Sequence, residues 1–445
     1  MKKEPSTVSG KLKRYAKVSK TVGSVTTKIA GRKLIGKNDE KKNADLIFNA
    51  LGGLKGPLMK VAQLLSTIPD ALPKGYSEKL QQLQADAPSM GWLFVKRRMS
   101  NELGKNWIKK FKRFEKNAIK AASLGQVHRA CINKQTLACK LQYPDMLSVV
   151  NADLRQIKLI FSLYKTWDKT INTGDIYDEI SVRLLEELDY EREQKNMLLY
   201  SKILSKEKQI NVPIPIKTHS TKRLITMTWL DGEPLMLYKK SKSHVKNEIA
   251  LALFKAWYIP FYRYGIIHGD PHPGNYQVNY HKGLVKINLL DFGCIRVFSP
   301  KFVKGVIDLY KAMRDDNKAL AVEAYKAWGF KKLSNEVIDV LNMWANYVYG
   351  PLLVDKKRFI QNKNTGKNGK DIAKEVYKKL KKLGGVTPPK EFVLIDRAAV
   401  GLGSVFMHLN AKLNWHQLLE EMIENFDENT LKIKQEKVLK EVGLK

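Results

Sequence analysis

The chain has 445 residues, three cysteines and a formal net charge of +35. Its length allows a large buried core divided over two or three domains. The odd number of cysteines, without metal-knuckle spacing, predicts neither a disulfide framework nor a zinc site and makes a reducing compartment the default. The excess of lysine and arginine indicates an anionic partner, such as a nucleotide, a lipid surface or nucleic acid, or reflects a compositional bias of the genome.

The first residues are polar and do not form the apolar segment of a secretory signal, and no apolar run is long enough to span a bilayer. We therefore expect a cytoplasmic protein without a signal peptide or a transmembrane helix. In residues 1–36, apolar residues recur at spacings of three and four among lysines, which predicts a basic amphipathic helix. Such a helix either attaches the protein peripherally to an anionic membrane or packs on its own domain.

The next part of the chain changes from a helical to a strand pattern. Residues 43–103 remain helical in pattern, with breaks at glycine and proline. Two short strands are predicted at residues 126–131 and 136–141, joined by a turn at Asn133 and Lys134. A long helical stretch to about residue 167 follows, so the β segment is flanked by helices on both sides.

Farther along, one helix is predicted over residues 175–204, followed by a buried strand at residues 224–230. A β-hairpin is expected between Asn275 and Asp291. Beyond Pro300 the pattern is helical, with interruptions at residues 362–370 and at 388–389. These patterns predict an α+β architecture with its strands in the middle of the chain.

Two short motifs carry the strongest chemical signal. Residues 268–275 read His-Gly-Asp-Pro-His-Pro-Gly-Asn, and residues 291–293 read Asp-Phe-Gly. Phosphoryl transfer from ATP uses one carboxylate to orient the accepting hydroxyl, and a second carboxylate with an amide oxygen to hold the metal ions. Asp270, Asn275 and Asp291 supply these groups in the order that kinases use. The pair of motifs therefore predicts a kinase-type phosphotransferase site.

Lys140 provides the next candidate group. It lies in the predicted strand 136–141, where a kinase places the lysine that contacts the α- and β-phosphates. It follows the small-residue turn Ala121-Ala122-Ser123, which occupies the position of a phosphate-binding loop. We expect Lys140 and this turn to bind the nucleotide phosphates.

On these residues, the chain resembles the UbiB/ADCK (aarF-domain-containing) family of atypical kinases. Its four family-like motifs are Lys60-Val61-Ala62-Gln63, Ala121-Ala122-Ser123, Glu187-Leu188-Asp189, and the His-Gly-Asp-Pro-His-Pro-Gly-Asn loop with Asp-Phe-Gly. The first resembles the family's Lys-x-Gly-Gln motif and the third its Glu-x-Asp motif. The resemblance extends over about residues 50–300 and implies a bilobal protein-kinase-like fold with a helical N-terminal extension and a mainly helical C-terminal lobe.

The resemblance also implies a division of the chain. Residues 1–36 would be the basic amphipathic segment, and residues 37–105 the helical extension with the Lys-x-Gly-Gln-like motif. Residues 106–232 would form the kinase-like N-lobe with inserted helices, and residues 233–445 the helical C-lobe.

Roles follow from the resemblance. Asp270 would be the catalytic carboxylate, Lys140 would bind phosphate and pair with Glu193, and Asn275 with Asp291 would hold Mg²⁺. Lys60 would pair with Glu187 over the active site. Further members of the implied nucleotide and gating sites are the hinge residues Thr228, Trp229, Leu230 and Asp231, and the motif residues Gln63 and Asp189. We expect Glu193 on the same helix as Glu187.

Two positions depart from the family pattern. Ala62 replaces a glycine, and Lys120 stands where a further alanine is usual. Neither change removes a catalytic group, so the departures concern ATP affinity and selectivity rather than the fold.

The segment after Gly293 limits which molecule can accept the phosphoryl group, because only six residues lie between Gly293 and Pro300. A protein kinase places an activation segment and an Ala-Pro-Glu anchor there to bind peptides. We therefore expect an ATPase or small-molecule kinase that uses ATP and Mg²⁺ and supports ubiquinone or other isoprenoid-lipid metabolism, as the resemblance implies.

Two alternatives are a phosphotransferase of the aminoglycoside or choline kinase kind, and a non-catalytic module in which nucleotide binding controls the binding of a lipid or protein partner. Specific nucleic-acid binding is not expected, because the basic residues are spread along the chain without a zinc knuckle or an aromatic RNA-binding signature.

Overall fold

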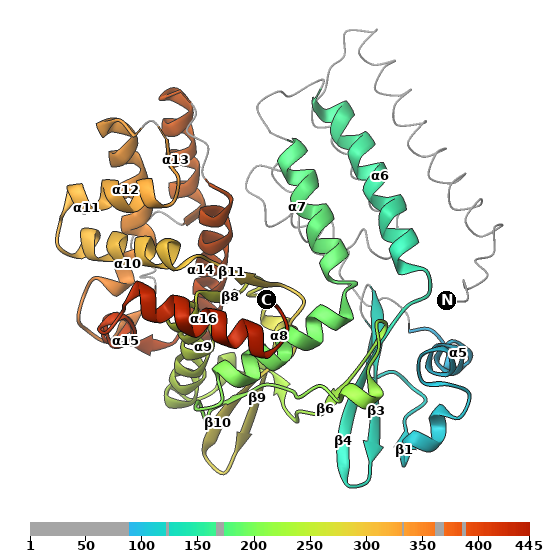
Figure 1. Ribbon diagram of the computed structural model, residues 1–445. Helices are drawn as coiled ribbons and strands as arrows, with labels where there is room; N and C mark the ends of the chain where they lie inside the picture. Colours follow the sequence, from blue (N-terminus) through green and yellow to red (C-terminus); the bar gives the residue numbers. More distant parts are fainter. Residues whose placement is uncertain (1–88, 122–123, 166–172, 332, 361–368, 385–388) are drawn as a thin grey trace. The chain divides into compact units, whose positions relative to one another are not determined.

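The computed structural model describes residues 89–121, 124–165, 173–331, 333–360, 369–384 and 389–445 (Figure 1). The described chain divides into two compact units, with residues 192–215 and 230–445 in the second unit and the other described residues in the first. The chain passes between the units after Glu191, Pro215 and Trp229.

The first unit is built around a five-stranded sheet with strand order β1-β3-β4-β6, and β2 also pairs with β3. Its strands are β1 (Arg113–Phe114), β2 (Lys120–Ala121), β3 (Gly125–Ile132), β4 (Gln135–Gln142) and β6 (Leu224–Thr228). All pairings are antiparallel, and Lys140 of β4 is opposite Val127 of β3 and Ile225 of β6. The predicted strands at 126–131, 136–141 and 224–230 are thus confirmed within one to two residues at their ends.

The helices among the described residues of the first unit are α5 (Trp92–Leu103), η1 (Trp107–Lys110), α6 (Met146–Lys165), α7 (Thr173–Glu186) and η2 (Lys217–His219), besides the first two residues of the helix that starts at Tyr190. Val95 and Met99 of α5 and Trp107 of η1 pack on the buried strand residues Leu137 and Cys139, so alternate strand side chains form a core with these helices.

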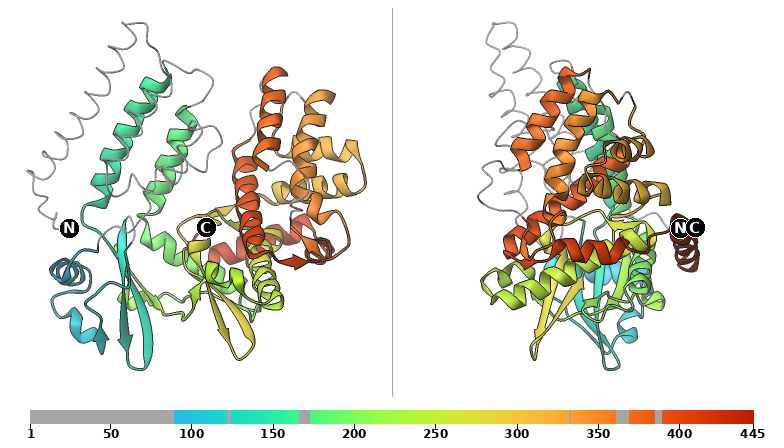
Figure 2. Two further views of the ribbon diagram at one scale, coloured as in Figure 1. Left: turned by 180° about the vertical axis from the view of Figure 1, so that it is seen from behind. Right: turned by 90° about the vertical axis from the view of Figure 1, so that its left-hand side faces the viewer.

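Helices α6 and α7 run side by side (Figure 2) and share an apolar core. Val150, Leu154 and Ile157 of α6 lie at spacings of three and four and pack with Ile180 and Leu184 of α7. This spacing places the three α6 residues on one face of the helix.

The described residues of the second unit form three small sheets. One has the order β5-β10-β9-β7, the second pairs β11 with β8, and the third pairs β12 with β13. The strands are β5 (Ile210–Asn211), β7 (Glu233–Pro234), β8 (Ile266–His268), β9 (Tyr276–His281), β10 (Leu284–Leu289), β11 (Ile295–Val297), β12 (Arg358–Phe359) and β13 (Lys412–Leu413). The predicted hairpin is confirmed as β9–β10, and its turn places Lys282 and Gly283 at positive φ, 49° and 80°.

The described helices of the second unit include a long, largely buried one over residues 243–264 and continue to the C-terminus. They are α8 (Tyr190–Ile203, its first two residues counted with the first unit), η3 (Leu235–Lys240), α9 (Ser243–Tyr264), η4 (Pro273–Asn275), α10 (Pro300–Arg314), α11 (Lys318–Ala327), α12 (Asn335–Tyr349), η5 (Gly350–Leu352), α13 (Gly369–Lys382), α14 (Lys390–Leu409), α15 (Trp415–Ile423) and α16 (Glu428–Glu441). The helical pattern expected beyond Pro300 is confirmed, except that β12 and β13 form a short additional pair.

Local sequence explains where these helices begin and end. Ser299 caps α10 by accepting a hydrogen bond from the backbone N–H of Phe302 at 3.2 Å, and Pro300 occupies the first turn, where its missing N–H costs nothing. Gly265 ends α9 in the left-handed conformation, with φ 63°, and its N–H donates to Phe261 O at 2.8 Å. The N–H of Phe298, the residue before Ser299, donates to the carbonyl of Gly265 at 2.7 Å, which holds the start of β8 close to the start of α10.

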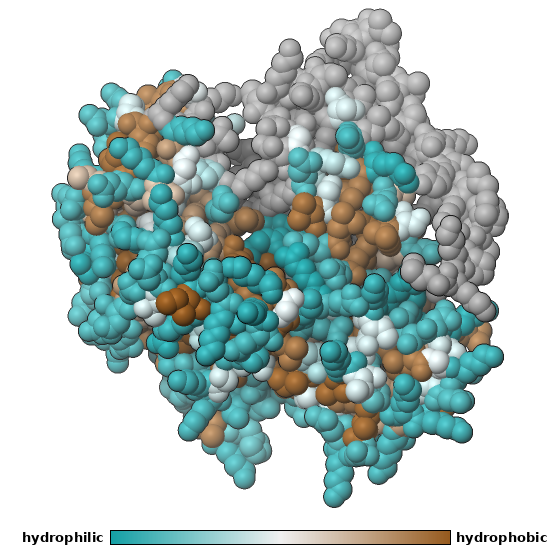
Figure 3. Space-filling view, viewed as in Figure 1, coloured by the Kyte–Doolittle hydropathy of each residue, from teal (hydrophilic) through white to brown (hydrophobic). Residues whose placement is uncertain are grey.

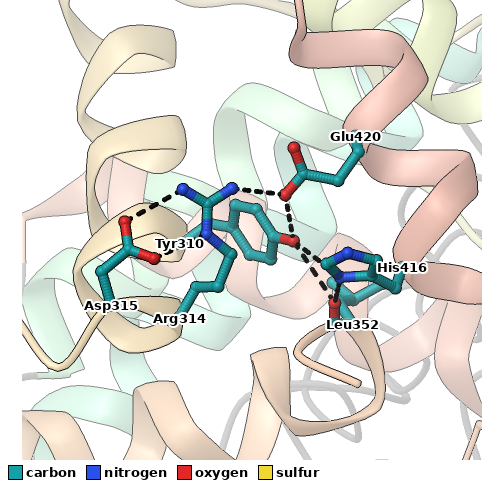
Figure 4. A network of polar contacts seen from close by, with 6 residues as sticks. All are labelled: Tyr310, Arg314, Asp315, Leu352, His416 and Glu420. Carbon is teal, nitrogen blue, oxygen red and sulfur yellow. Dashed lines mark hydrogen bonds and ion pairs between the residues drawn. The ribbon is translucent and has the colours of Figure 1, made fainter. Parts of the chain in front are cut away.

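A polar network fastens three helical segments of this unit together (Figure 4). Tyr310 of α10 donates its hydroxyl hydrogen to Glu420 of α15 at 2.7 Å, and Arg314 Nη1 donates to the same carboxylate oxygen at 2.7 Å. His416 Nδ1 donates to the carbonyl of Leu352 in η5 at 2.8 Å. Burial alone would raise the pKa of Glu420, but the hydrogen bonds from Tyr310 and Arg314 outweigh it and lower the pKa.

Polar side chains dominate the visible face of the second unit, and its apolar areas are separate and small (Figure 3). Among the described residues, no helix combines the length and the apolar character that a membrane span requires.

One predicted element is wrong in its extent. The single helix expected over residues 175–204 is two helices, α7 and α8, separated by a turn at residues 187–189. In this turn the carbonyl of Leu188 accepts hydrogen bonds from the side-chain amide of Gln142 at 3.1 Å and from the backbone N–H of Tyr190 at 3.2 Å. Glu187 therefore lies in the turn and Glu193 on α8, so the two acids do not share a helix.

Candidate functional site

The residues of the His-Gly-Asp motif form a short loop between β8 and β9. Both carboxylate oxygens of Asp270 accept hydrogen bonds: Oδ2 from Asn275 Nδ2 at 3.0 Å and Oδ1 from the backbone N–H of His272 at 3.3 Å. His272 N-caps η4, accepting from the N–H of Gly274 through Nδ1 at 3.1 Å. The loop thus fixes the orientation of the half-buried Asp270 carboxylate.

The β9–β10 hairpin brings Asp291 back to this loop. Tyr276, the first residue of β9, is opposite Leu289, the last residue of β10, and the N–H of Leu290 donates to the carbonyl of Asn275 at 3.1 Å. Asp291 follows directly, and its Oδ1 accepts from the N–H of Gly293 at 2.9 Å. Asn275 and Asp291 are therefore held at the same end of one hairpin.

His268 connects the two motifs. Its side chain is 3% exposed, and its Nδ1 accepts from the backbone N–H of Asp270 at 3.2 Å. Since Nδ1 is an acceptor, the neutral ring carries its proton on Nε2, which donates to the carbonyl of Asp291 at 2.5 Å. One buried imidazole thereby positions the backbone of both carboxylate residues.

Helix α8 supports the Asp-Phe-Gly segment from a second side. Asn196, 2% exposed, donates its side-chain N–H to the carbonyl of Phe292 at 2.8 Å. Tyr200, one turn later, packs edge-on against the ring of Phe292 at 5.6 Å and against His268 at 6.2 Å between ring centroids. The backbone is therefore hydrogen bonded on both sides of Asp291, through the N–H of Leu290 and the carbonyl of Phe292.

Tyr276, the first residue of β9, is fully buried as a neutral phenol. Burial, and next the negative charge of Asp270, raises the pKa of Tyr276 well above its ordinary value. Its hydroxyl oxygen accepts from the indole N–H of Trp257 at 2.9 Å. Tyr276 is thus a structural support and does not ionise near neutral pH.

In the first unit, Lys140 lies on the opposite face of β4 from the fully buried Cys139 and Leu141, as strand alternation requires. Its ammonium nitrogen is 5.2 Å from the ring centroid of Tyr190, the first residue of α8, a distance suited to a cation–π contact. Burial raises the pKa of the Cys139 thiol to about 12.

The predicted phosphate loop is described in part. Ala121 ends β2 opposite Gln126 of β3, and Gly125 starts β3. A Cβ at Gly125 would lie 2.4 Å from the carbonyl oxygen of Leu141, so only glycine allows this close pairing of the two strands. Ala122 and Ser123 lie outside the described residues.

The four predicted hinge residues lie where the chain passes between the units, after Trp229. Thr228 ends β6, and the N–H of Trp229 donates to the carbonyl of Thr136 at 3.0 Å. Beyond the crossing, Leu230 is half-buried and the carbonyl of Asp231 accepts from the side chains of Asn279 and Asn288 at 2.9 and 3.0 Å. The backbone is therefore anchored on each side of the crossing.

The remaining predicted residues belong to the α7–α8 turn, to α8 and to residues 60–63. Glu187 is half-buried and Asp189 exposed in the α7–α8 turn, and Glu193 is 3% exposed on α8. Lys60, Ala62 and Gln63 lie outside the described residues, so their contact with the turn stays a prediction. The pairing of Lys140 with Glu193 joins the two units and also stays a prediction.

Comparison with known proteins decides the family. The ABC1 atypical kinase-like domain matches residues 82–325, more than half of the chain. The chain belongs to this ABC1 family. Atypical kinase COQ8, mitochondrial, of Saccharomyces cerevisiae is 30% identical over 61% of this chain and 55% of its own length. The COQ8 kinase of Schizosaccharomyces pombe is 29% identical over 72% of this chain and 54% of its own length, so the matches span about half of these relatives.

A solved structure of Rv3197 from Mycobacterium tuberculosis in complex with erythromycin has a similar fold. It has a TM-score of 0.59 and 23% sequence identity, and the match covers 88% of this chain and 98% of that one. At this identity the likeness shows the fold alone. The predicted UbiB/ADCK membership and the α+β, bilobal kinase-like fold are confirmed.

The ABC1 site offers oxygen donors that fit a magnesium-nucleotide complex. Asn275 Nδ2 faces the carboxylate and the carbonyl of Asp270, at 3.0 and 3.3 Å, which assigns the amide orientation and leaves Oδ1 as the donor oxygen for a cation. Within the described residues, no cluster of three or more His, Cys, Asp or Glu side chains forms a metal site. Mg²⁺ is commonly held by one or two carboxylates together with phosphate oxygens, and Asp291 with Asn275 fits that pattern.

Sequence reasoning assigned no role to His268, Asn196 and Tyr200 in this ABC1 domain. His268 was visible within its motif, and Asn196 lies one turn beyond Glu193, so both had a signal in the sequence. Tyr200 had no such signal, because in the sequence it looks like any other apolar residue of a helix.

Proposed function

We propose that this ABC1-family chain binds Mg-ATP and either hydrolyses it or transfers its γ-phosphoryl group to a small molecule or lipid. The observation that carries the proposal is the fixed constellation of Asp270, Asn275 and Asp291, in which hydrogen bonds orient two carboxylates and an amide at one end of the β9–β10 hairpin. Phosphoryl transfer depends on such positioning more than on covalent chemistry by the protein.

Each residue has a proposed role. Asp270 orients the attacking hydroxyl or water and accepts its proton, while Asn275 and Asp291 hold Mg²⁺, which neutralises charge on the phosphates. Lys140, the Ala121-Ala122-Ser123 turn and the backbone at residues 228–231 bind the nucleotide. Glu193 orients Lys140, and the pair Lys60–Glu187, with Gln63 and Asp189 beside it, controls access.

A small acceptor is favoured by the chain beyond Asp-Phe-Gly. After Gly293, the residues Cys294 to Ser299 contain β11, which pairs with β8, and α10 begins at Pro300. The N–H of Gly269 donates to the carbonyl of Cys294 at 2.6 Å, so this short segment is fastened to the catalytic loop itself. This segment is too short to form a peptide-binding platform, which supports a lipid or other small molecule as the phosphoryl acceptor.

By the family resemblance, we place the activity in ubiquinone or other isoprenoid-lipid metabolism, with peripheral attachment to an anionic membrane through residues 1–36. The net charge of +35 favours such a surface. Removing residues 1–36 should weaken binding to vesicles containing anionic lipid and leave nucleotide binding intact. Equal vesicle binding by both forms would refute the attachment.

The experiment that tests the catalytic proposal measures phosphate release from Mg-ATP by the full chain and by Asp270→Asn, with and without candidate isoprenoid lipids. We expect the wild type to turn over ATP, and the variant to lose about two or more orders of magnitude, in line with the loss of a positioned base. Binding of Mg-ATP without any difference in turnover would instead support a non-catalytic, nucleotide-controlled binding module.

A further inference from the structure

Helix α14 (Lys390–Leu409) contains two glycines in its interior, Gly401 and Gly403. Glycine in the middle of a helix is less favourable than alanine by about 1 kcal/mol, because it loses more backbone freedom on folding. A glycine at such a position therefore needs a local reason.

The surroundings give a reason for Gly401 alone. A Cβ at Gly401 would lie 2.2 Å from Cγ, 3.1 Å from Cβ and 3.6 Å from Cδ of Pro271, whereas a Cβ at Gly403 would have no atom within 4 Å. The backbone of α14 is thus in direct contact with the ring of Pro271. This proline is the residue after Asp270.

Neither partner can move aside easily. The pyrrolidine ring of Pro271 is closed on its own backbone, so it can change its pucker but cannot rotate away from α14 as an open side chain could. On the other side, α14 is held by the buried residues Leu402, Val405 and Phe406 and by the hydrogen bond from the indole N–H of Trp344 to Asp396 at 2.6 Å. A push from α14 would therefore be transmitted to the catalytic loop.

We infer that Gly401 is a positioning residue for Asp270: its missing side chain allows α14 to support the ring of Pro271 and so to fix the catalytic loop, in addition to the hydrogen bonds that His268 and Asn275 make to Asp270. This role in turnover rests on the proposed function. The support itself is a property of the fold and can be measured without activity.

The size of the effect follows from the geometry. Carbon atoms in contact stand about 3.5 to 4.0 Å apart, so a Cβ at 2.2 Å from Pro271 Cγ requires a shift of at least about 1 Å. A misplacement of about 1 Å in a catalytic group can lower the rate by about 100-fold. We expect Gly401→Ala to lower kcat by about that factor, with a smaller change in KM for ATP.

Gly403→Ala is the matched control, because it makes the same substitution two residues away on the same helix with nothing to meet. It should keep kcat within about twofold of the wild type. The double variant Gly401→Ala, Pro271→Ala removes the ring atom that the new Cβ would meet, so Gly401→Ala should cost far less in a Pro271→Ala background. Equal losses from Gly401→Ala in both backgrounds would contradict the proposed contact.

Hydrogen exchange provides a readout that does not need turnover. Backbone amides in residues 269–275 should exchange faster in Gly401→Ala than in Gly403→Ala or the wild type, and protection should return when the Pro271 ring is also removed. Unchanged protection and unchanged kcat in Gly401→Ala would overturn the inference. If the wild type consumes no ATP but the exchange pattern holds, the proposed function fails and the positioning contact stands.

Discussion

The hydrogen bond from Asn196 to the carbonyl of Phe292 allows a sharp test of how helix α8 holds the Asp-Phe-Gly segment. In Asn196→Asp the side chain keeps its shape but loses the N–H groups that donate to this buried carbonyl. When ionised, the new carboxylate would be buried facing an oxygen. When protonated, it could donate an O–H in place of the amide N–H.

The loss of unfolding free energy in Asn196→Asp depends on pH. With the acid protonated we expect a loss of about 1 kcal/mol in the free energy of unfolding, for an imperfectly replaced hydrogen bond. With the carboxylate ionised we expect about 3 kcal/mol, because a buried charge is left unpaired. The difference of about 2 kcal/mol corresponds to a pKa of the new carboxyl raised by about 1.5 units, from about 3.9 to about 5.4.

The direction of the pH dependence follows from that raised pKa. A group with a raised pKa in the folded state contributes stability below its unfolded pKa and loses it as pH rises through the folded pKa. The destabilisation of Asn196→Asp relative to wild type should therefore grow between about pH 4 and pH 6 and remain constant above. Urea titrations at a series of pH values would measure it.

Asn196→Leu is the control, since it removes the donor without adding a titratable group. It should destabilise by about 2 kcal/mol at every pH, the cost of a buried carbonyl without its partner. Both variants should also need more Mg²⁺ for half-maximal turnover, because the carbonyl follows Asp291 directly. A destabilisation by Asn196→Asp that does not change with pH would refute the burial and orientation described for this side chain.

Two further predictions concern the same chain. Tyr310→Phe removes a hydrogen bond to Glu420 that lowers the pKa of this carboxyl from its ordinary 4.5. The variant should therefore lose about 1.5 kcal/mol of unfolding free energy near pH 7, as measured by urea titration. This difference from the wild type should shrink as the pH falls below about 4.5, and a difference that stays constant with pH would contradict the role of the hydrogen bond. Burial raises the pKa of the Cys139 thiol to about 12, so this residue should remain unmodified by a maleimide at pH 7.5 in the folded protein. Mass spectrometry that shows Cys139 labelled before unfolding would disprove its burial.

Much of the fold was predictable because its signals are local. The β3–β4 and β9–β10 hairpins consist of strand-forming residues on either side of short turns at Asn133 and at Lys282-Gly283, and Ser299-Pro300 is a recognisable helix start. The His-Gly-Asp and Asp-Phe-Gly motifs were recognisable because their residue types and spacing match the groups that phosphoryl transfer uses.

What the sequence did not predict depends on contacts between distant residues. The break between α7 and α8 is stabilised by Gln142, which donates to the carbonyl of Leu188 from 46 residues away, while the apolar pattern of the helices continues through the turn. From the sequence, Gly401 could be recognised only as a glycine in a helix, because the reason for it is its close approach to Pro271, which is far away in the sequence. Periodicity does not report such pairings.

The most direct test of the central claim is calorimetric titration of ATP, with and without Mg²⁺, into the wild type, Asp270→Asn and Asp291→Asn. If Asp291 holds the metal, wild type and Asp270→Asn should bind ATP more tightly with Mg²⁺ than without it, and Asp291→Asn should lose that difference. An Mg²⁺ effect in Asp291→Asn equal to that of the wild type would contradict the assignment of this carboxylate to the metal, and with it the proposed phosphotransferase site.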